Sequence, residues 1–122
     1  MKTILVVDDS RIMRNIVKNT FVELRIPCDF LEAENGNAAY HQLETHKVDL
    51  VFLDWNMPEM DGMEFLKKVR AMPIYKDIPI IMVTPESAKY SVVEAVQSGV
   101  TDYIVKPISE KIFMEKLLGI HF

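Results

Sequence analysis

Near its amino terminus the chain has the stretch Ile4-Leu5-Val6-Val7-Asp8-Asp9-Ser10, a short apolar run followed by two acids. Its four apolar residues are too few for a buried helix and are rich in β-branched side chains, so they predict a strand buried on both faces. Ser10 can cap a following helix, whose apolar positions recur at helical spacing from Ile12 to Leu24. The stretch therefore predicts one βα unit with two acids at the carboxyl end of its strand.

The same alternation of a short apolar run and a helical pattern occurs five times along the chain. The other apolar runs are 30–33, 50–53, 80–83 and 103–105, and the helical patterns after them open at 36, after the candidate cap Asp61, at about 86, and at about 109. The run 30–33 is more polar, which is typical of a strand at a sheet edge. Five such units predict an α/β fold, a doubly wound (βα)5 domain over residues 1–122, with helices on both faces of a five-stranded parallel sheet.

Composition narrows the class of protein. The chain has 122 residues, a net charge of −4 from 14 Lys+Arg against 18 Asp+Glu, and 49% apolar residues. These values are typical of one globular domain, and the acidic balance argues against partners such as nucleic acid or a membrane. No apolar stretch approaches the roughly 20 residues of a membrane span, and acids follow the start too early for a secretory signal. We expect a cytoplasmic monomer in which Cys28, the one cysteine, is a buried thiol without a disulfide.

Chemically capable side chains stand where the predicted strands end. Asp8 and Asp9 follow the first run, Asp54 closes the third, Thr84 follows the fourth and Lys106 follows the fifth. In parallel α/β sheets, ligands bind beyond the carboxyl ends of the strands. We therefore expect these five side chains to share one site.

Three carboxylates at one edge of the sheet repel one another, so either their pKa values rise or a cation lies among them. At about 5 Å separation each pair repels by roughly 3 kcal/mol at an effective dielectric of about 20. Oxygen ligands beside an open cleft favour Mg²⁺ with retained water, and the absence of histidine from the strand ends argues against zinc. A divalent cation, a lysine and a hydroxyl facing an aspartate are the groups that phosphoryl transfer needs, and the aspartate can be its nucleophile.

Four motifs together resemble one protein family over essentially the whole chain. They are the stretch at 4–10, Asp54-Trp55-Asn56-Met57-Pro58-Glu59-Met60-Asp61-Gly62, Met82-Val83-Thr84, and Tyr103-Ile104-Val105-Lys106-Pro107. The family is that of response regulator receiver domains, in the single-domain chemotaxis type. The resemblance implies the flavodoxin-like strand order 2-1-3-4-5 and a cis Lys106–Pro107 bond.

The resemblance also implies a role for each motif residue. Asp54 would be phosphorylated by a histidine kinase, and the domain would not be an enzyme beyond catalysing its own phosphorylation and dephosphorylation. Mg²⁺ would be held by Asp9, Asp54 and the backbone carbonyl of Asn56, with Asp8 acting through water. Thr84 and Lys106 would bind the phosphoryl oxygens, and Tyr103 would be the aromatic switch that follows Thr84.

Pro85 departs from the family pattern. The family usually has a small residue here, whose backbone N–H donates to a phosphoryl oxygen, and proline has no N–H. We expect weaker retention of the phosphoryl group, and two alternatives stay open: an intermediate of a phosphorelay, and a pseudo-receiver that acts only as an interaction module.

The fourth helix suggests where a target protein binds. Its apolar positions, with Val92 and Val96 among them, span an arc of roughly 160°, wider than the stripe that one buried face needs. Together with Lys89, Tyr103 on the fifth strand and Lys116 on the fifth helix, they predict a partner surface. The alternative is that the extra valines pack against neighbouring elements.

Overall fold

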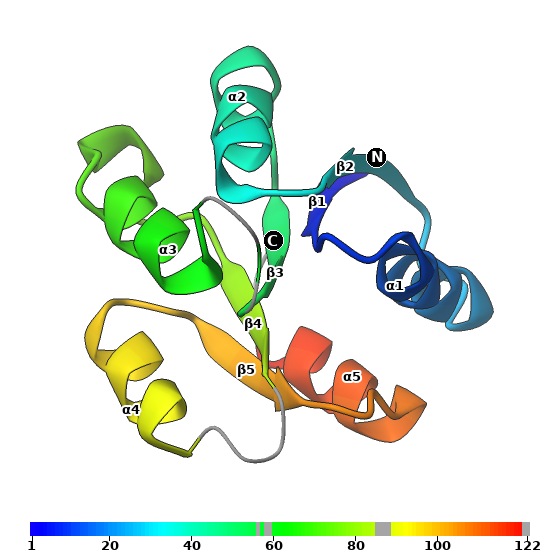
Figure 1. The fold of residues 1–122 in the computed structure, drawn as a ribbon. Helices are drawn as coiled ribbons and strands as arrows, with labels where there is room; N and C mark the ends of the chain where they lie inside the picture. The colour runs from blue at the N-terminus through cyan, green and yellow to red at the C-terminus, as the bar shows by residue number, and fades with distance from the viewer. Residues whose placement is uncertain (56, 58–59, 85–88, 121–122) are drawn as a thin grey trace.

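A computed structural model describes residues 1–55, 57, 60–84 and 89–120 (Figure 1). Residues 89–91 are described by their backbone alone. The elements alternate strictly between strand and helix, apart from one 3₁₀ turn. In chain order they are β1 (Lys2–Val7), α1 (Arg11–Glu23), β2 (Cys28–Ala33), α2 (Gly36–Thr45), β3 (Leu50–Asp54), α3 (Gly62–Arg70), the 3₁₀ turn η1 (Pro73–Tyr75), β4 (Ile80–Thr84), α4 (Lys89–Gln97), β5 (Asp102–Val105) and α5 (Glu110–Leu118). The predicted order of five βα units is confirmed.

All strands are parallel, in the order β2-β1-β3-β4-β5, as the resemblance implied. β3 and β4 are buried at every residue, and β1 is buried over its last four, because each has a strand on either side and helices above and below. β2 lies at an edge, as its polar sequence predicted. It begins at Cys28, two residues before the predicted run, because Lys2 and Thr3 of β1 pair with Cys28 and Asp29.

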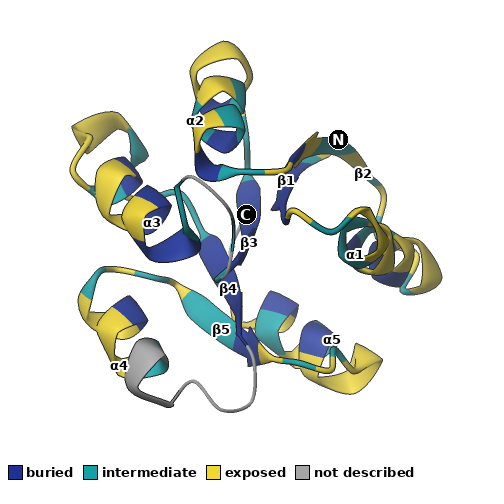
Figure 2. Cartoon of the chain, in the orientation of Figure 1, coloured by how far each residue is buried: buried dark blue, intermediate teal, exposed yellow. Residues whose placement is uncertain are grey.

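The helices form two layers, with α1 and α5 on one side of the sheet and α2, α3 and α4 on the other (Figure 1). Alternate strand residues point into the two resulting cores, so the central strands and the inward sides of the helices are the buried parts, whereas the edge strands β2 and β5 are only partly buried (Figure 2). On the α1 and α5 side, Phe52 stacks on Phe113 with ring centroids 5.1 Å apart, and Phe21 meets both rings edge-on. This packing holds the sheet in place, and with it the strand ends that carry the predicted site residues.

Side-chain caps determine where the helices begin. Ser10, Asn35, Asp61 and Ser109 each accept a backbone N–H from the first turn of the following helix. These bonds satisfy donors that a helix start leaves unpaired. After α4 the chain turns at Gly99 with φ +97°, a left-handed conformation that glycine adopts readily.

Two local expectations need correction. Ile12 and Ile16 of α1 are exposed, because the sheet covers only the stripe formed by Val17, Thr20 and Phe21. Cys28 is half-buried rather than buried; burial still raises the pKa of its thiol. The Lys106–Pro107 bond is cis, as the resemblance implied. Among the described helices, none combines the length and the apolar character that a membrane crossing requires.

Candidate functional site

The predicted site residues meet at the carboxyl edge of the sheet. Asp54 and Thr84 are the last residues of β3 and β4, while Asp8 and Lys106 directly follow β1 and β5. The four strands that carry them are consecutive neighbours in the sheet. The fold therefore brings together residues that lie almost 100 positions apart in the sequence.

Three carboxylates form a cluster at this edge. One oxygen from each of Asp8, Asp9 and Asp54 lies within 4.8 Å of the others. Asp8 and Asp54 are buried, whereas Asp9 is exposed, so the cluster opens to solvent on one side. An all-oxygen set of this kind could hold a hard divalent cation that keeps part of its water shell.

The cluster makes ionisation of Asp8 costly. Burial raises the pKa of the Asp8 carboxyl to about 6, and the charge of Asp54 adds to this effect. The Ser10 N–H opposes it by donating to Asp8 Oδ1 at 2.8 Å. A bound cation would relieve this repulsion.

Lys106 is the basic side chain that contacts Asp54. Its Nζ lies 3.0 Å from Asp54 Oδ1, and its backbone N–H donates to the Thr84 carbonyl at 2.8 Å. Burial raises the pKa of Asp54, and the hydrogen bond from Lys106 opposes that rise. A single lysine leaves most of the negative charge of the cluster uncompensated, so the site still attracts a cation.

Thr84 supplies independent evidence that this edge of the sheet is a ligand site. The residue is fully buried, and its hydroxyl has no hydrogen-bond partner among the residues that the structure describes. Leaving a buried hydroxyl unpaired costs about 1–3 kcal/mol, so such groups usually have a functional explanation. An anionic ligand oxygen at this edge would provide the acceptor that the hydroxyl lacks.

The first residue of α3, Gly62, lies against the backbone of Asp54 and Trp55. Gly62 donates its N–H to the Trp55 carbonyl at 2.9 Å, and a Cβ at Gly62 would collide with the carbonyl oxygen of Asp54. Only glycine, which has no Cβ, permits such a close approach between the start of α3 and the Asp54 carbonyl. Asp61 is the cap that the sequence predicts, whereas Gly62 appeared only as part of the family motif and no role was predicted for it.

Arg14 also contacts the site, and no role was predicted for it from the sequence. Its guanidinium donates to the carbonyl of Asp8 at 2.6 Å and to the carboxylate of Glu32 at 2.9 Å. Nothing in the local pattern distinguishes Arg14 from the other basic residues of α1. The contact becomes visible only once β2 is placed beside β1.

The predicted switch and partner residues lie on α4, β5 and α5. Tyr103 is half-buried against the core, with Lys116 Nζ 4.9 Å from its ring centroid. Lys116 also pairs with Asp102 at 2.9 Å. Val96 is 57% exposed and Val92 is partly exposed, so the expectation that apolar surface of α4 stays uncovered is confirmed.

Several predicted features fall outside the described residues. They are the carbonyl of Asn56, Pro85 with its missing N–H, and the side chain of Lys89.

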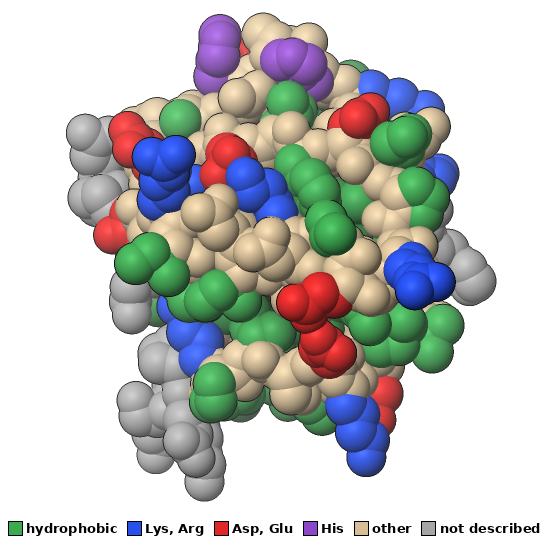
Figure 3. Space-filling model, turned by 90° about the vertical axis from the view of Figure 1, so that its right-hand side faces the viewer, with side chains coloured by type: hydrophobic (Ala, Val, Ile, Leu, Met, Phe, Trp, Pro, Cys, Tyr) green, Lys and Arg blue, Asp and Glu red, His purple; other side chains and the backbone are tan. Residues whose placement is uncertain are grey.

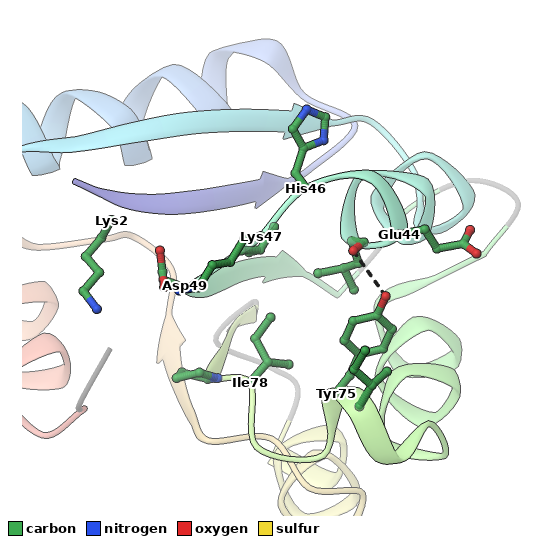
Figure 4. A pocket seen from close by; sticks show the side chains of 11 residues that line it. Lys2, Glu44, His46, Lys47, Asp49, Tyr75 and Ile78 are labelled. Carbon is green, nitrogen blue, oxygen red and sulfur yellow. Dashed lines mark hydrogen bonds between the residues drawn. The ribbon is translucent and has the colours of Figure 1, made fainter.

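Two other regions of the described surface lack this convergence of groups. Figure 3 shows the side that carries α1, where hydrophobic side chains lie scattered between charged ones of both signs. A cavity of about 570 Å³ lies at the opposite, amino-terminal edge of the sheet, where Lys2, Asp49 and Pro79 line it (Figure 4). Its polar side chains point in different directions, and the Tyr75 hydroxyl already donates to the Leu43 carbonyl. The acidic edge is thus the candidate site.

Comparison with known proteins agrees with this geometry. The family model described as "Response regulator receiver domain" matches residues 4–118. A chemotaxis protein CheY homolog from Campylobacter jejuni is 50% identical over 115 residues, covering 93% of this chain and 88% of that protein. Among solved structures, Vibrio cholerae CheY4 has a TM-score of 0.88 at 31% identity, covering 99% of both chains. The Mn²⁺-bound form of response regulator Rcp1 has a TM-score of 0.82 at 26% identity, covering 98% of this chain and 91% of that one. The chain belongs to the family of response regulator receiver domains and is a chemotaxis response regulator of the CheY type.

Proposed function

We propose that the receiver domain, taken over residues 1–122, accepts a phosphoryl group on Asp54 from a histidine kinase, uses Mg²⁺, and signals by binding a target protein. One observation carries this proposal: a buried aspartate has a lysine ammonium at 3.0 Å and two further carboxylates within 4.8 Å. No other acidic residue among those that the structure describes combines these features with a strand end.

The acidic cluster fits Mg²⁺ by its chemistry. Asp9 and Asp54 would bind the ion directly and Asp8 through water, together with the carbonyl of Asn56. All of these ligands are oxygens, the type that Mg²⁺ prefers. The related response regulator Rcp1 has a Mn²⁺-bound form, which supports a divalent cation as the ligand of such a domain. When bound, the ion supplies neutralisation of charge on the phosphoryl oxygens.

The reaction follows from the placement of Asp54. Its carboxylate oxygen attacks phosphorus, the new O–P bond forms as the bond to the phosphohistidine nitrogen breaks, and the nitrogen keeps the electron pair. Lys106 Nζ, now 3.0 Å from Asp54 Oδ1, then contacts a phosphoryl oxygen. The unpaired hydroxyl of Thr84 donates to another. The same groups would promote transfer from a small donor and later hydrolysis by water.

We propose that movement of Thr84 toward the phosphoryl group changes the position of Tyr103. The target would bind beside it, on the surface formed by Val92, Val96, Tyr103 and Lys116, with Lys89 as a further predicted member. The 57% exposure of Val96 supports an apolar contact there, and Lys116 offers a positive charge at its border.

Trp55, the one tryptophan, provides the test because it follows Asp54 directly. We expect its fluorescence to change on addition of Mg²⁺ and to change again with acetyl phosphate. Asp54→Asn should abolish the second change. A wild-type protein that responds to neither addition would contradict the proposal and favour the interaction-only alternative.

A further inference from the structure

We infer that Arg14 is a positioning residue for the metal site, because it fixes the peptide unit that joins Asp8 to Asp9. The inference rests on the proposed binding of Mg²⁺ by these aspartates. Arg14 lies near the start of α1, and it donates to the backbone carbonyl of Asp8 rather than to the carboxylate of Asp8 or Asp9. It would act through the backbone that carries them.

The guanidinium spans two elements. Nη1 donates to the Asp8 carbonyl at 2.6 Å, while Nε donates to Glu32 Oε1, on the edge strand β2, at 2.9 Å. Only 14% of the Arg14 side chain is exposed, so the surroundings hold it in this position. A planar fork of fixed donors can satisfy both acceptors at once.

The contact matters because Asp9 is exposed. The position of its carboxylate therefore depends on the backbone before it. The Asp8 N–H donates to the Ala33 carbonyl at 3.0 Å, and Asp8 Oδ1 accepts the Ser10 N–H at 2.8 Å. Arg14 adds the bond that holds the Asp8 carbonyl itself. Without that bond the Asp8–Asp9 peptide could rotate, which would carry the Asp9 carboxylate away from the cluster.

Lys18 offers a matched control. It lies one turn further along α1, and its Nζ is 3.0 Å from the other oxygen of Glu32, with 27% of the side chain exposed. Arg14→Met and Lys18→Met each remove one cation and one ion pair to Glu32. Only Arg14→Met also frees the Asp8 carbonyl.

The sign of the effect separates positioning from charge. Arg14 and Lys18 are cations and repel Mg²⁺. The loss of either charge, taken by itself, would therefore strengthen Mg²⁺ binding in both variants. Loss of positioning weakens it in Arg14→Met alone. Substituting the partners that orient metal ligands commonly costs about 10–100-fold in metal affinity; because Arg14 acts on backbone, we expect a loss of about tenfold.

The experiment is a Mg²⁺ titration of wild type, Arg14→Met and Lys18→Met, followed by Trp55 fluorescence. We expect Arg14→Met to bind about tenfold more weakly and Lys18→Met within about twofold of wild type. Acetyl phosphate should modify Lys18→Met at the wild-type rate. Urea denaturation without metal shows whether each variant is folded; if Arg14→Met is not, Arg14→Lys, which keeps the charge and loses the fork, takes its place.

Two results would overturn the inference: unchanged or tighter Mg²⁺ binding when Arg14 is substituted, or equal weakening in both variants. A wild-type protein with no Mg²⁺ response contradicts the proposed function itself, and the inference with it.

Discussion

Asp8→Asn should make the metal-free protein more stable, although it removes a residue of the site. Burial and the nearby charge of Asp54 raise the pKa of the Asp8 carboxyl from an ordinary 3.8 to about 6. An asparagine oxygen can still accept the Ser10 N–H that now bonds Asp8 Oδ1. The substitution therefore removes the repelled charge and keeps the local hydrogen bond.

The pKa difference sets the magnitude. The gap between 3.8 and about 6 corresponds to about 3 kcal/mol, at about 1.4 kcal/mol per pKa unit. Because solvent reaches the open side of the cluster, we expect the unfolding free energy to rise by only about 1–2 kcal/mol at neutral pH. Urea denaturation with a chelator, followed by Trp55 fluorescence, measures the change.

The pH dependence has a defined sign. The folded protein holds the Asp8 proton more tightly than the unfolded chain, so the wild type loses stability as the pH rises from 3.8 through about 6. The advantage of Asp8→Asn should thus be complete at neutral pH and vanish near pH 4. Added Mg²⁺ should stabilise the wild type more than the variant. Asp49→Asn, which replaces another carboxylate that accepts a backbone N–H, should gain nothing. A variant no more stable than the wild type at neutral pH would refute this reasoning.

Three further substitutions test other parts of the account. Thr84→Val removes the unpaired buried hydroxyl, so the unfolding free energy measured by urea denaturation should rise by about 1 kcal/mol. Acetyl phosphate should modify this variant more slowly than the wild type. A lower unfolding free energy would contradict the expectation. Gly62→Ala forces a Cβ against the Asp54 carbonyl and should lower the unfolding free energy by about 1–3 kcal/mol, whereas wild-type stability would show that the close approach is unimportant. Arg25 has φ +58° after α1, so Arg25→Gly should gain about 0.5–1 kcal/mol, and a measured loss would argue against strain at this turn.

The central strands could be predicted because a parallel sheet covered on both faces buries every residue of such strands. Continuous apolar runs at 50–53 and 80–83 therefore identified β3 and β4. The start of β2 could not be found in this way, because Cys28 and Asp29 join the sheet through pairing with β1 rather than through their own polarity. The strand order likewise came from the family resemblance, since an apolar run does not specify its neighbours.

The first helix shows how far periodicity extends. Spacing alone included Ile12 and Ile16 in the apolar stripe, yet both are exposed. The width that the sheet covers is a tertiary property, which only the neighbouring strands determine. Pro27 indicates that the unit ends here, but the turn itself is closed by Arg25 in a left-handed conformation usually left to glycine, which the sequence does not indicate.

The candidate site was predictable where strand ends carry charge. Asp8, Asp54 and Lys106 each follow or close an apolar run, and parallel pairing brings strand ends together. What the sequence could not indicate is how these groups are supported. The unpaired hydroxyl of Thr84 and the contact of Arg14 with a main-chain carbonyl exist only in three dimensions.

All the proposed signalling depends on phosphorylation of Asp54, which intact-mass measurement detects without a reporter group. The wild-type protein, treated with acetyl phosphate and Mg²⁺, should gain the mass of one phosphoryl group. The gain should be absent with a chelator, and absent in Asp54→Asn under either condition. A phosphoryl group that appears on Asp54→Asn, or no gain on the wild type with Mg²⁺ present, would contradict the account.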